Sequence, residues 1–175
     1  MLECTLESSF AMPLVADDSR KNVPQLAFGL YKVSKEECSK VVQNAIQVGY
    51  RHFDCAPSYE NEKDFGDGLK AALQKQDIKR SDLCICSKVW KDSVRVGRKA
   101  VRRSIEKSIE DLCCDYLDIA MIHWPVPDYH IEAYKELEIM VQEGIIRSLG
   151  LSNYHEKVRH LTLATTDDPS NSIGI

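Results

Sequence analysis

Short apolar segments alternate with amphipathic segments along most of this sequence, and that alternation limits the fold more than any other feature. The apolar segments are a few residues long and end at polar or turn-forming residues, as buried strands do. The segments between them carry apolar residues at helical spacing. Alternating β and α units predict a parallel sheet with right-handed crossovers. We expect strands at 25–31, 52–54, 83–88, 116–124 and 145–153, and helices at 34–49, from 61 onward, at 97–112, 131–143 and 155–164.

The first predicted helix has recognisable ends. Ser34 is a suitable N-cap, Glu36 and Glu37 follow in the first turn, and Gly49 stands at the usual helix stop. Its apolar face is expected to consist of Cys38, Val41, Val42, Ala45 and Ile46. The predicted strand 83–88 has apolar or small residues at nearly every position, which favours a parallel sheet covered on both faces.

The 175 residues are enough for one domain with a real core. We expect residues 1–25 to form a β-hairpin cap, with strands near 10–15 and 23–26, and residues 26–164 to form the βα units. Residues 165–175 are polar and turn-like and are expected to be irregular.

Composition and charge exclude several classes of protein. The net charge is −4, which argues against a nucleic-acid surface. The acidic N-terminus lacks a signal-peptide core, and no apolar run approaches the roughly 18 residues that a membrane span needs. We therefore expect a cytoplasmic protein that binds neither nucleic acid nor membranes. A basic cluster on the predicted helix 97–112 and just before it is more typical of a solvated helix face than of an anion-facing patch; it comprises Arg95, Arg98, Lys99, Arg102 and Arg103.

The seven cysteines do not indicate a metal site. Their number is odd and none of them forms a C-x-x-C pair. Cys84 and Cys86 alternate inside a predicted strand and are expected to be small buried hydrophobes.

Four predicted strands end on polar side chains at regular intervals. Asp54, Lys88, His123 and Asn153 are 34, 35 and 30 residues apart, one βα unit each. In an α/β barrel the carboxyl ends of all strands open on one face, which holds the active site. Core packing does not need Asp, Lys and His at these places. The spacing therefore predicts a functional site, with Tyr59 on the loop five residues after Asp54.

These residue types together suit the protonation of a carbonyl group. A Tyr has an unperturbed pKa of about 10, and we expect the Lys88 ammonium to lower the pKa of Tyr59. Asp54 is expected to hold the Lys88 charge by an ion pair, and His123 to orient a bound carbonyl. Protonating a carbonyl oxygen is useful only when hydride reaches the carbon, and a nicotinamide cofactor delivers hydride.

Four stretches in this order, GYRHFDCAPSYENE, SKVW, IHWP and LGLSNY, resemble the aldo-keto reductase family. The resemblance covers about residues 10–164. It implies a (β/α)₈ TIM barrel that binds NADP(H) and reduces aldehydes and ketones, with small-molecule carbonyl compounds as substrates. For the catalytic residues it implies Tyr59 as proton donor, with Lys88 and Asp54 as the pair that adjusts its pKa. It implies His123 as the residue that orients the substrate.

The same resemblance implies the binding residues. Ser152 and Asn153 would hold the nicotinamide carboxamide, and Asp54 would also contact the cofactor. The remaining cofactor contacts would come from the backbone around Gly29 to Lys32, which includes Leu30 and Tyr31. Tyr31, His123 and Trp124 would line the substrate pocket, and no metal is expected.

The chain departs from the family pattern in length. A (β/α)₈ barrel typically needs about 250 residues, whereas this sequence has about five βα units and no sixth strand of useful length after Ala164. We expect open sheet edges at the first and fifth strands, self-association through them, and weak or absent reductase activity. The cofactor contacts that the family places in the last three strands are expected to be missing.

Two other functions stay open at the level of sequence. A half-barrel that binds a partner chain would be an interaction or regulatory protein, and a Lys88 Schiff base would indicate a lyase. Asp54 argues against the Schiff base because ion pairing keeps the lysine protonated. A G-x-G-x-x-A match at 66–71 falls inside a predicted helix, so we interpret it as chance and expect Gly68 only to weaken that helix slightly.

Overall fold

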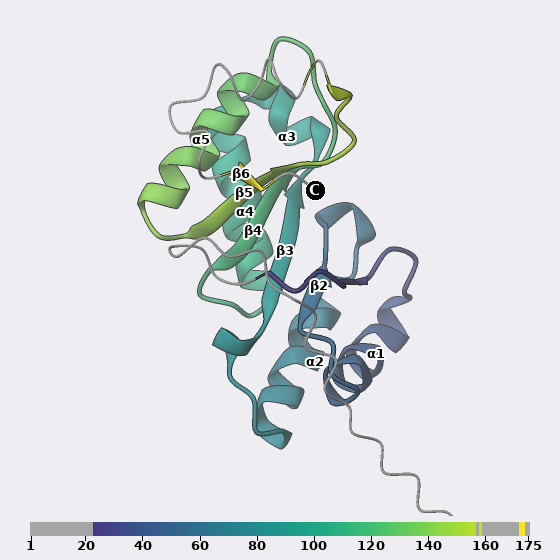
Figure 1. Ribbon diagram of the computed structural model, residues 1–175. Coiled ribbons are helices and arrows are strands. Elements are labelled where there is room, and N and C mark those ends of the chain that lie inside the picture. Colours follow the sequence, from purple (N-terminus) through teal and green to yellow (C-terminus); the bar gives the residue numbers. More distant parts are fainter. Residues whose placement is uncertain (1–22, 157, 159–171, 174–175) are drawn as a thin grey trace, which may run out of the picture.

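The computed structural model describes residues 23–156, 158 and 172–173, and its centre is a parallel sheet (Figure 1). The strand order is β1-β2-β3-β4-β5-β6, and every neighbouring pair is parallel. The predicted parallel sheet of consecutive strands is therefore confirmed. The strands are β1 (Phe28–Gly29), β2 (His52–Asp54), β3 (Cys84–Val89), β4 (Leu117–Ile122), β5 (Ile146–Leu151) and β6 (Ser172–Ile173).

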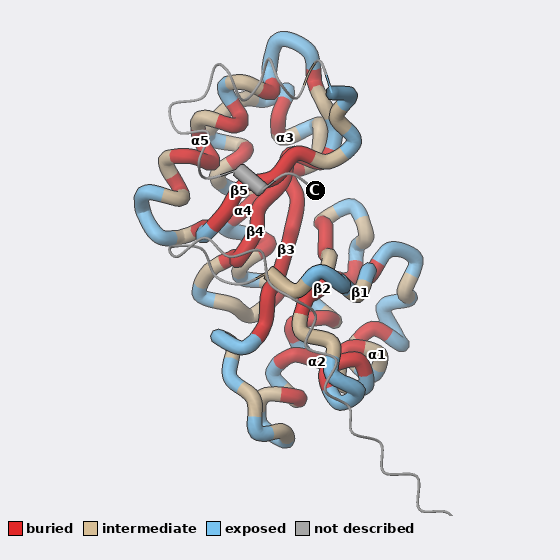
Figure 2. The backbone as a smooth tube through the Cα atoms, in the orientation of Figure 1, coloured by how far each residue is buried: buried red, intermediate tan, exposed pale blue. Residues whose placement is uncertain are grey.

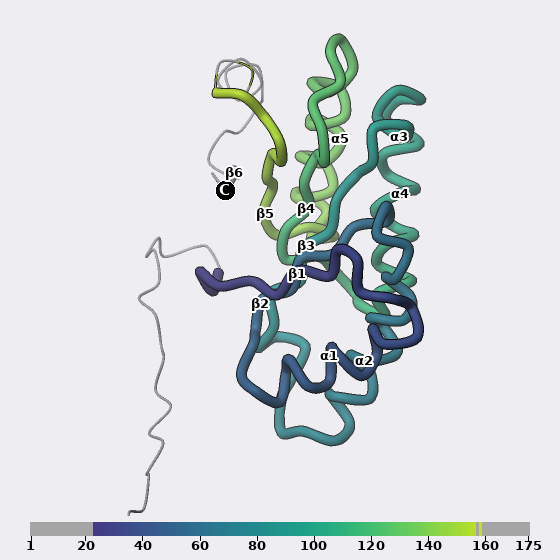
Figure 3. Tube along the Cα trace, turned by 90° about the vertical axis from the view of Figure 1, so that its right-hand side faces the viewer, coloured from purple at the N-terminus to yellow at the C-terminus, as the bar shows by residue number. Residues whose placement is uncertain are grey.

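Five α-helices connect or follow the strands among the described residues, and they lie on one side of the curved sheet (Figure 3). The apolar core fills the space between the helices and the sheet, and the central strands are buried along their length (Figure 2). This layering leaves the carboxyl ends of the strands and their loops to form the site. The helices are α1 (Lys35–Gln47), α2 (Glu62–Lys75), α3 (Lys91–Val96), α4 (Arg98–Asp111) and α5 (His130–Gln142), with short 3₁₀ turns at Pro57–Tyr59 and Arg80–Asp82.

Helix α1 forms as its end signals predict. The Ser34 hydroxyl accepts a hydrogen bond from the backbone N–H of Glu37 at 3.3 Å, which caps the helix. Gly49 follows the helix with φ of +103°, a conformation that glycine adopts without strain. The predicted apolar face is buried except for Val41, which is partly exposed.

The glycine motif at 66–71 lies inside α2, as expected for a chance match. Its glycines nevertheless have a packing role that the sequence analysis missed. A Cβ at Gly66 would meet the carbonyl oxygen of Asp111 at 2.2 Å, and a Cβ at Gly68 would meet that of Ser39 at 2.6 Å. The two glycines therefore let α2 approach α1 and the end of α4 closely, and Gly68 does more than weaken the helix.

Four local predictions differ from the structure. Residues 23–26, where the second strand of the hairpin is predicted, form no strand. The first strand has two residues instead of the predicted 25–31, and the helix α3 between β3 and α4 was not predicted. The tail expected to be irregular contains β6, which pairs with Leu149 and Gly150 of β5. The edge of β5 is therefore covered there, where the sequence predicts an open edge. A two-residue strand is too short for a periodic pattern to reveal it.

Several predicted elements cannot be compared with the structure. The hairpin strand near 10–15 and most of the helix 155–164 lie outside the described residues. Within the described part, no helix is both long and apolar enough to cross a membrane. Cys84 and Cys86 are buried free thiols, as predicted.

The basic cluster contacts acidic residues of α5. The Arg98 and Arg102 side chains both donate to the carboxylate of Glu136, at 2.9 and 2.7 Å, and Arg102 also donates to Glu143 at 2.7 Å. These ion pairs join α4 to α5 on the outside of the molecule, which favours the interpretation as a helix face over an anion-binding patch.

Candidate active site

The structure brings the four polar strand ends to one pocket of about 740 Å³. Asp54 is the last residue of β2, and Lys88 is the last but one of β3. His123 follows β4 directly, and Asn153 lies two residues beyond β5. The parallel strands run in the same direction, so their ends meet on one face, as in a β/α barrel. The pocket is lined by Ala27, Tyr31, His52, Asp54, Ser58, Tyr59, Lys88, Trp90, Met121, His123, Trp124, Ser152 and Asn153.

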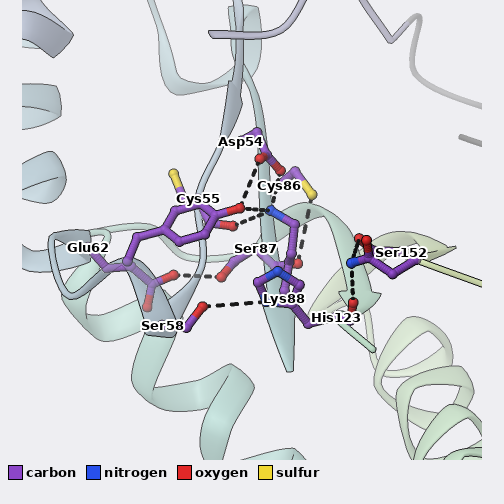
Figure 4. A network of polar contacts seen from close by, with 11 residues as sticks. Asp54, Cys55, Ser58, Glu62, Cys86, Ser87, Lys88, His123 and Ser152 are labelled. Atoms are coloured by element: carbon purple, nitrogen blue, oxygen red, sulfur yellow. Dashed lines mark hydrogen bonds and ion pairs between the residues drawn. The ribbon is translucent and has the colours of Figure 1, made fainter. Parts of the chain in front are cut away.

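Lys88 is the centre of the polar contacts in this pocket. Its buried ammonium forms an ion pair with Asp54 and donates to the backbone oxygen of Cys55 at 3.0 Å. It also donates to the Tyr59 hydroxyl at 3.0 Å, and that hydroxyl donates to the second Asp54 oxygen at 3.3 Å. Figure 4 shows the contacts of Lys88 with Asp54 and Cys55. All three donors of an ammonium group thus have partners.

The pKa of Tyr59 does not shift as the sequence analysis predicts. Burial raises it above its usual value of 10.0. The hydrogen bond and charge of Lys88 lower the pKa, but they only partly offset burial, and Asp54 raises it further. The expected lowering by Lys88 is therefore present, but the net shift of the pKa is upward because burial outweighs it. Tyr59 is a protonated donor at neutral pH.

The ammonium of Lys88 is stable in its charged form. Burial opposes the charge, yet the pKa of Lys88 is raised because the nearby Cys86 and Asp54 groups and the hydrogen bonds to Asp54 and Tyr59 outweigh burial. A lysine held in this state is a poor nucleophile. This observation argues against the Schiff-base alternative.

His123 is held between aromatic rings. Its imidazole meets the rings of Tyr59 and Trp90 edge-on, with centroids 5.9 and 5.1 Å away, and stacks beside Trp124 at 6.4 Å. The Ser58 hydroxyl lies 3.5 Å from Nδ1. Burial, together with the positive charge of Lys88, lowers the pKa of His123 to about 4. The imidazole is therefore neutral at physiological pH.

The predicted pocket walls are present. The ring of Tyr31 is exposed toward the pocket and lies 5.3 Å from the ring of Tyr59. Trp124 is about half exposed and borders the same space. Both side chains offer apolar surface next to the Tyr59 hydroxyl.

Some of the predicted cofactor residues line the pocket and others do not. Ser152 and Asn153 line the pocket, and the Asn153 amide donates to the His123 backbone oxygen at 2.8 Å and to the Ser152 hydroxyl at 3.0 Å. Gly29 and Leu30 are not among the lining residues, and the Leu30 side chain is buried in the core. Any cofactor contact from these two residues would have to involve their backbone.

Several lining residues were not singled out from the sequence. Trp90 stands two residues after Lys88, and its position within SKVW was a usable signal. The other four give no such signal because their contribution depends on how the strands curve; they are Ala27, His52, Ser58 and Met121. Among the described residues, no group of three or more His, Cys, Asp or Glu side chains is arranged to hold a metal ion.

A second buried carboxylate lies behind the site. Glu62, in the first turn of α2, accepts hydrogen bonds from the hydroxyls of Ser87 at 2.5 Å and Ser108 at 2.9 Å. Ser87 precedes Lys88 on β3, and its contact with Glu62 is visible in Figure 4. Burial raises the pKa of Glu62, although the two hydrogen bonds oppose the shift. The residue ties α2, β3 and α4 together.

Comparison with known proteins identifies the family. The model of the Aldo/keto reductase family matches residues 25–170. The chain belongs to the aldo/keto reductase family. It is 38% identical over 141 residues to the methylglyoxal reductase DkgA of Escherichia coli K12, covering 79% of this chain and 48% of DkgA. It is 34% identical over 163 residues to the NADPH-dependent D-xylose reductase of Meyerozyma guilliermondii, covering 78% and 51%.

Solved structures of this family agree with the fold. The aldose reductase of Schistosoma japonicum superposes with a TM-score of 0.82 at 31% identity, over 89% of this chain and 58% of that one. A Bombyx mori aldo-keto reductase in complex with NADP gives 0.81 at 26% identity, over 89% and 55%. The βα units are therefore part of the predicted barrel fold. The chain spans about half the length of the curated relatives it matches.

Proposed function

We propose that this chain carries the proton-donating part of an NADP(H)-dependent reductase that converts aldehydes or ketones to alcohols. The observation that carries this proposal is the Tyr59 hydroxyl in contact with both Lys88 and Asp54 inside one pocket. The names of the relatives support it, since methylglyoxal and D-xylose are carbonyl compounds and the xylose reductase is NADPH-dependent. A small carbonyl compound is the substrate class that we propose.

The residues at the rim of the pocket fit a nicotinamide group. Asn153 and Ser152 lie side by side there and offer an amide and a hydroxyl, which complement the donor and acceptor of a carboxamide. When bound, NADPH supplies the hydride that the carbonyl carbon receives. This supports the proposed roles of the two residues in cofactor binding.

The chain's own residues handle the proton. The Tyr59 hydroxyl would donate to the carbonyl oxygen of the substrate and pass its proton to that oxygen as the alcohol forms. The Lys88 ammonium stabilises the phenolate that remains, and Asp54 keeps that ammonium in place. Burial disfavours the phenolate, so the reaction depends on Lys88.

His123 would orient the substrate as a neutral group. Its pKa of about 4 means that the imidazole carries one N–H, which can donate to the carbonyl oxygen without transferring a charge. The neighbouring rings of Trp90 and Trp124 limit its rotation.

The first test is cofactor binding by the 175-residue chain. Trp90 and Trp124 both line the pocket, so NADPH should quench their fluorescence in a saturable manner. Tyr59→Phe should keep this binding and lower turnover of methylglyoxal about 10²-fold or more, whereas the exposed Tyr129→Phe should change neither. A folded sample that shows no saturable quenching would remove the proposal and favour the interaction-protein alternative. Weak turnover and self-association of this chain stay predictions.

A further inference from the structure

Asn61 stands where a helix cap is expected but does not cap its helix. It precedes α2 directly, the position at which Asn usually accepts a hydrogen bond from the first turn. Its side chain makes no such bond. Instead, the amide nitrogen donates to the backbone oxygens of Leu30 at 3.0 Å and Val33 at 2.9 Å. The residue is 1% exposed, so these contacts are made inside the protein.

The side-chain NH₂ group of Asn61 makes hydrogen bonds, whereas its amide oxygen makes none among the described residues. Both hydrogens of one NH₂ group point at two carbonyl oxygens of the same turn. The amide oxygen is buried, and among the described residues it accepts no hydrogen bond. An ionised aspartate has the same size and no donor. The contact therefore specifies an amide at this position.

The turn that Asn61 holds carries a wall of the active-site pocket. Leu30 to Val33 closes with a hydrogen bond from the Val33 N–H to the Leu30 oxygen at 3.1 Å, and Lys32 has φ of +65°. The Leu30 N–H is bonded to the backbone oxygen of Asp54 at 3.0 Å. The turn is thus fixed to the strand end on one side and to Asn61 on the other.

We propose that Asn61 is a positioning residue that holds the Leu30–Val33 turn, and with it the Tyr31 ring, against Tyr59. Asn61 is two residues from Tyr59 along the chain, so one side chain sets the spacing between the pocket wall and the proton donor. In the structure the ring centroids of Tyr31 and Tyr59 lie 5.3 Å apart. The catalytic consequence of this inference rests on the function proposed above.

Substrate binding and proton transfer should respond differently to a change at Asn61. The hydroxyl of Tyr59 makes its hydrogen bonds with Lys88 and Asp54, and neither contact involves Asn61. Releasing the turn should therefore weaken substrate binding while leaving proton transfer in the bound complex nearly intact. We expect Asn61→Ala to raise KM for a carbonyl substrate roughly tenfold. The change in kcat should stay within about threefold.

The decisive experiment compares Asn61→Asp with Asp118→Asn in the full chain. Asp118 is a buried carboxylate that accepts hydrogen bonds from Arg80 at 2.8 Å and from the Ile85 N–H at 2.9 Å, away from the pocket. Hydrogen exchange of residues 28–36 should be faster in Asn61→Asp than in the wild type and unchanged in Asp118→Asn. Equal exchange in wild type and Asn61→Asp, or equal acceleration in both variants, would overturn the inference.

This exchange measurement does not require activity, so it distinguishes the two proposals. If the wild type fails to bind NADPH, the proposed function is lost while the exchange result still decides the role of Asn61. If Asn61→Asp does not fold, Tyr31→Ala is the second variant, because the Tyr31 side chain is 64% exposed and its loss leaves the core intact. It should reproduce the rise in KM at nearly constant kcat. A fall in kcat without a change in KM would contradict the assignment.

Discussion

The Lys88 ammonium lies 3.0 Å from the Tyr59 hydroxyl, although 29 residues separate the two along the chain. The charge of Lys88 and its hydrogen bond lower the pKa of Tyr59 and so oppose the effect of burial, which raises it. The proposed proton transfer leaves a negative charge on the phenol oxygen. Lys88 is therefore the residue on which that step depends most.

Replacing Lys88 by Met should raise the pKa of Tyr59 further and lower kcat about 10²-fold or more. The Met side chain fills similar space but offers neither the charge nor the hydrogen bond. Steady-state kinetics and a titration of Tyr59 by nuclear magnetic resonance would measure both effects. Lys91→Met is the matched control, since Lys91 does not line the pocket. An unchanged kcat in Lys88→Met would contradict the role of Lys88.

His123 should titrate with a pKa of about 4 in the folded protein, below its usual value of 6.5. A lowered pKa means that the folded state binds fewer protons than the unfolded state between about pH 4 and 6.5. The contribution of His123 to stability is therefore complete above pH 6.5 and is lost as the pH falls toward 4. A ¹³C-labelled imidazole signal would report the pKa directly, and a midpoint near 6.5 would contradict the burial argument.

Glu62→Gln should make the protein more stable at neutral pH. The raised pKa of Glu62 means that its effect on stability is most favourable below about pH 4.5 and is lost as the pH rises through the folded-state pKa. A neutral Gln can keep one hydrogen bond to each of the hydroxyls of Ser87 and Ser108. Urea unfolding between pH 4 and 8 measures this dependence.

Glu143→Gln is the control for that measurement. Glu143 is exposed, and its hydrogen bonds with Arg102 lower its pKa. Its contribution to stability is present at neutral pH and is lost as the pH falls, which is the opposite sign. The same pH dependence in both variants would show that burial of Glu62 is not the cause.

Gly68→Ala should destabilise the protein by about 1–3 kcal/mol. Its new Cβ would lie 2.6 Å from the backbone oxygen of Ser39, so α1 and α2 would have to separate. Helix propensity alone favours Ala over Gly by roughly 1 kcal/mol, so the sign of the result decides between close packing and propensity. Gly29→Ala is the matched control, because nothing lies within 4 Å of its Cβ position. Thermal unfolding of both variants gives the comparison.

Much of the site was predictable because its residues lie at strand ends. The spacing of Asp54, Lys88 and His123 by one βα unit indicated a shared face, and the structure places all three in one pocket. The sign of the Tyr59 pKa shift was not predictable, because it depends on how much water the fold removes from the phenol. The role of Asn61 was hidden for a related reason. Its position before α2 indicates a helix cap. In the structure its side chain instead donates to the nearby Leu30–Val33 turn, which no local pattern predicts.

The sequence by itself determined the alternation of strands and helices up to β5, apart from helix α3. It also determined the helix ends at Ser34 and Gly49 and the residues that follow each strand, because these depend on local periodicity and end signals. The tertiary structure alone decided which distant groups touch. It brought α2 close enough to α1 to require Gly68, paired β6 with β5, and buried His123 among rings that keep it neutral. Those features depend on distances between segments far apart in the chain, which no local pattern encodes.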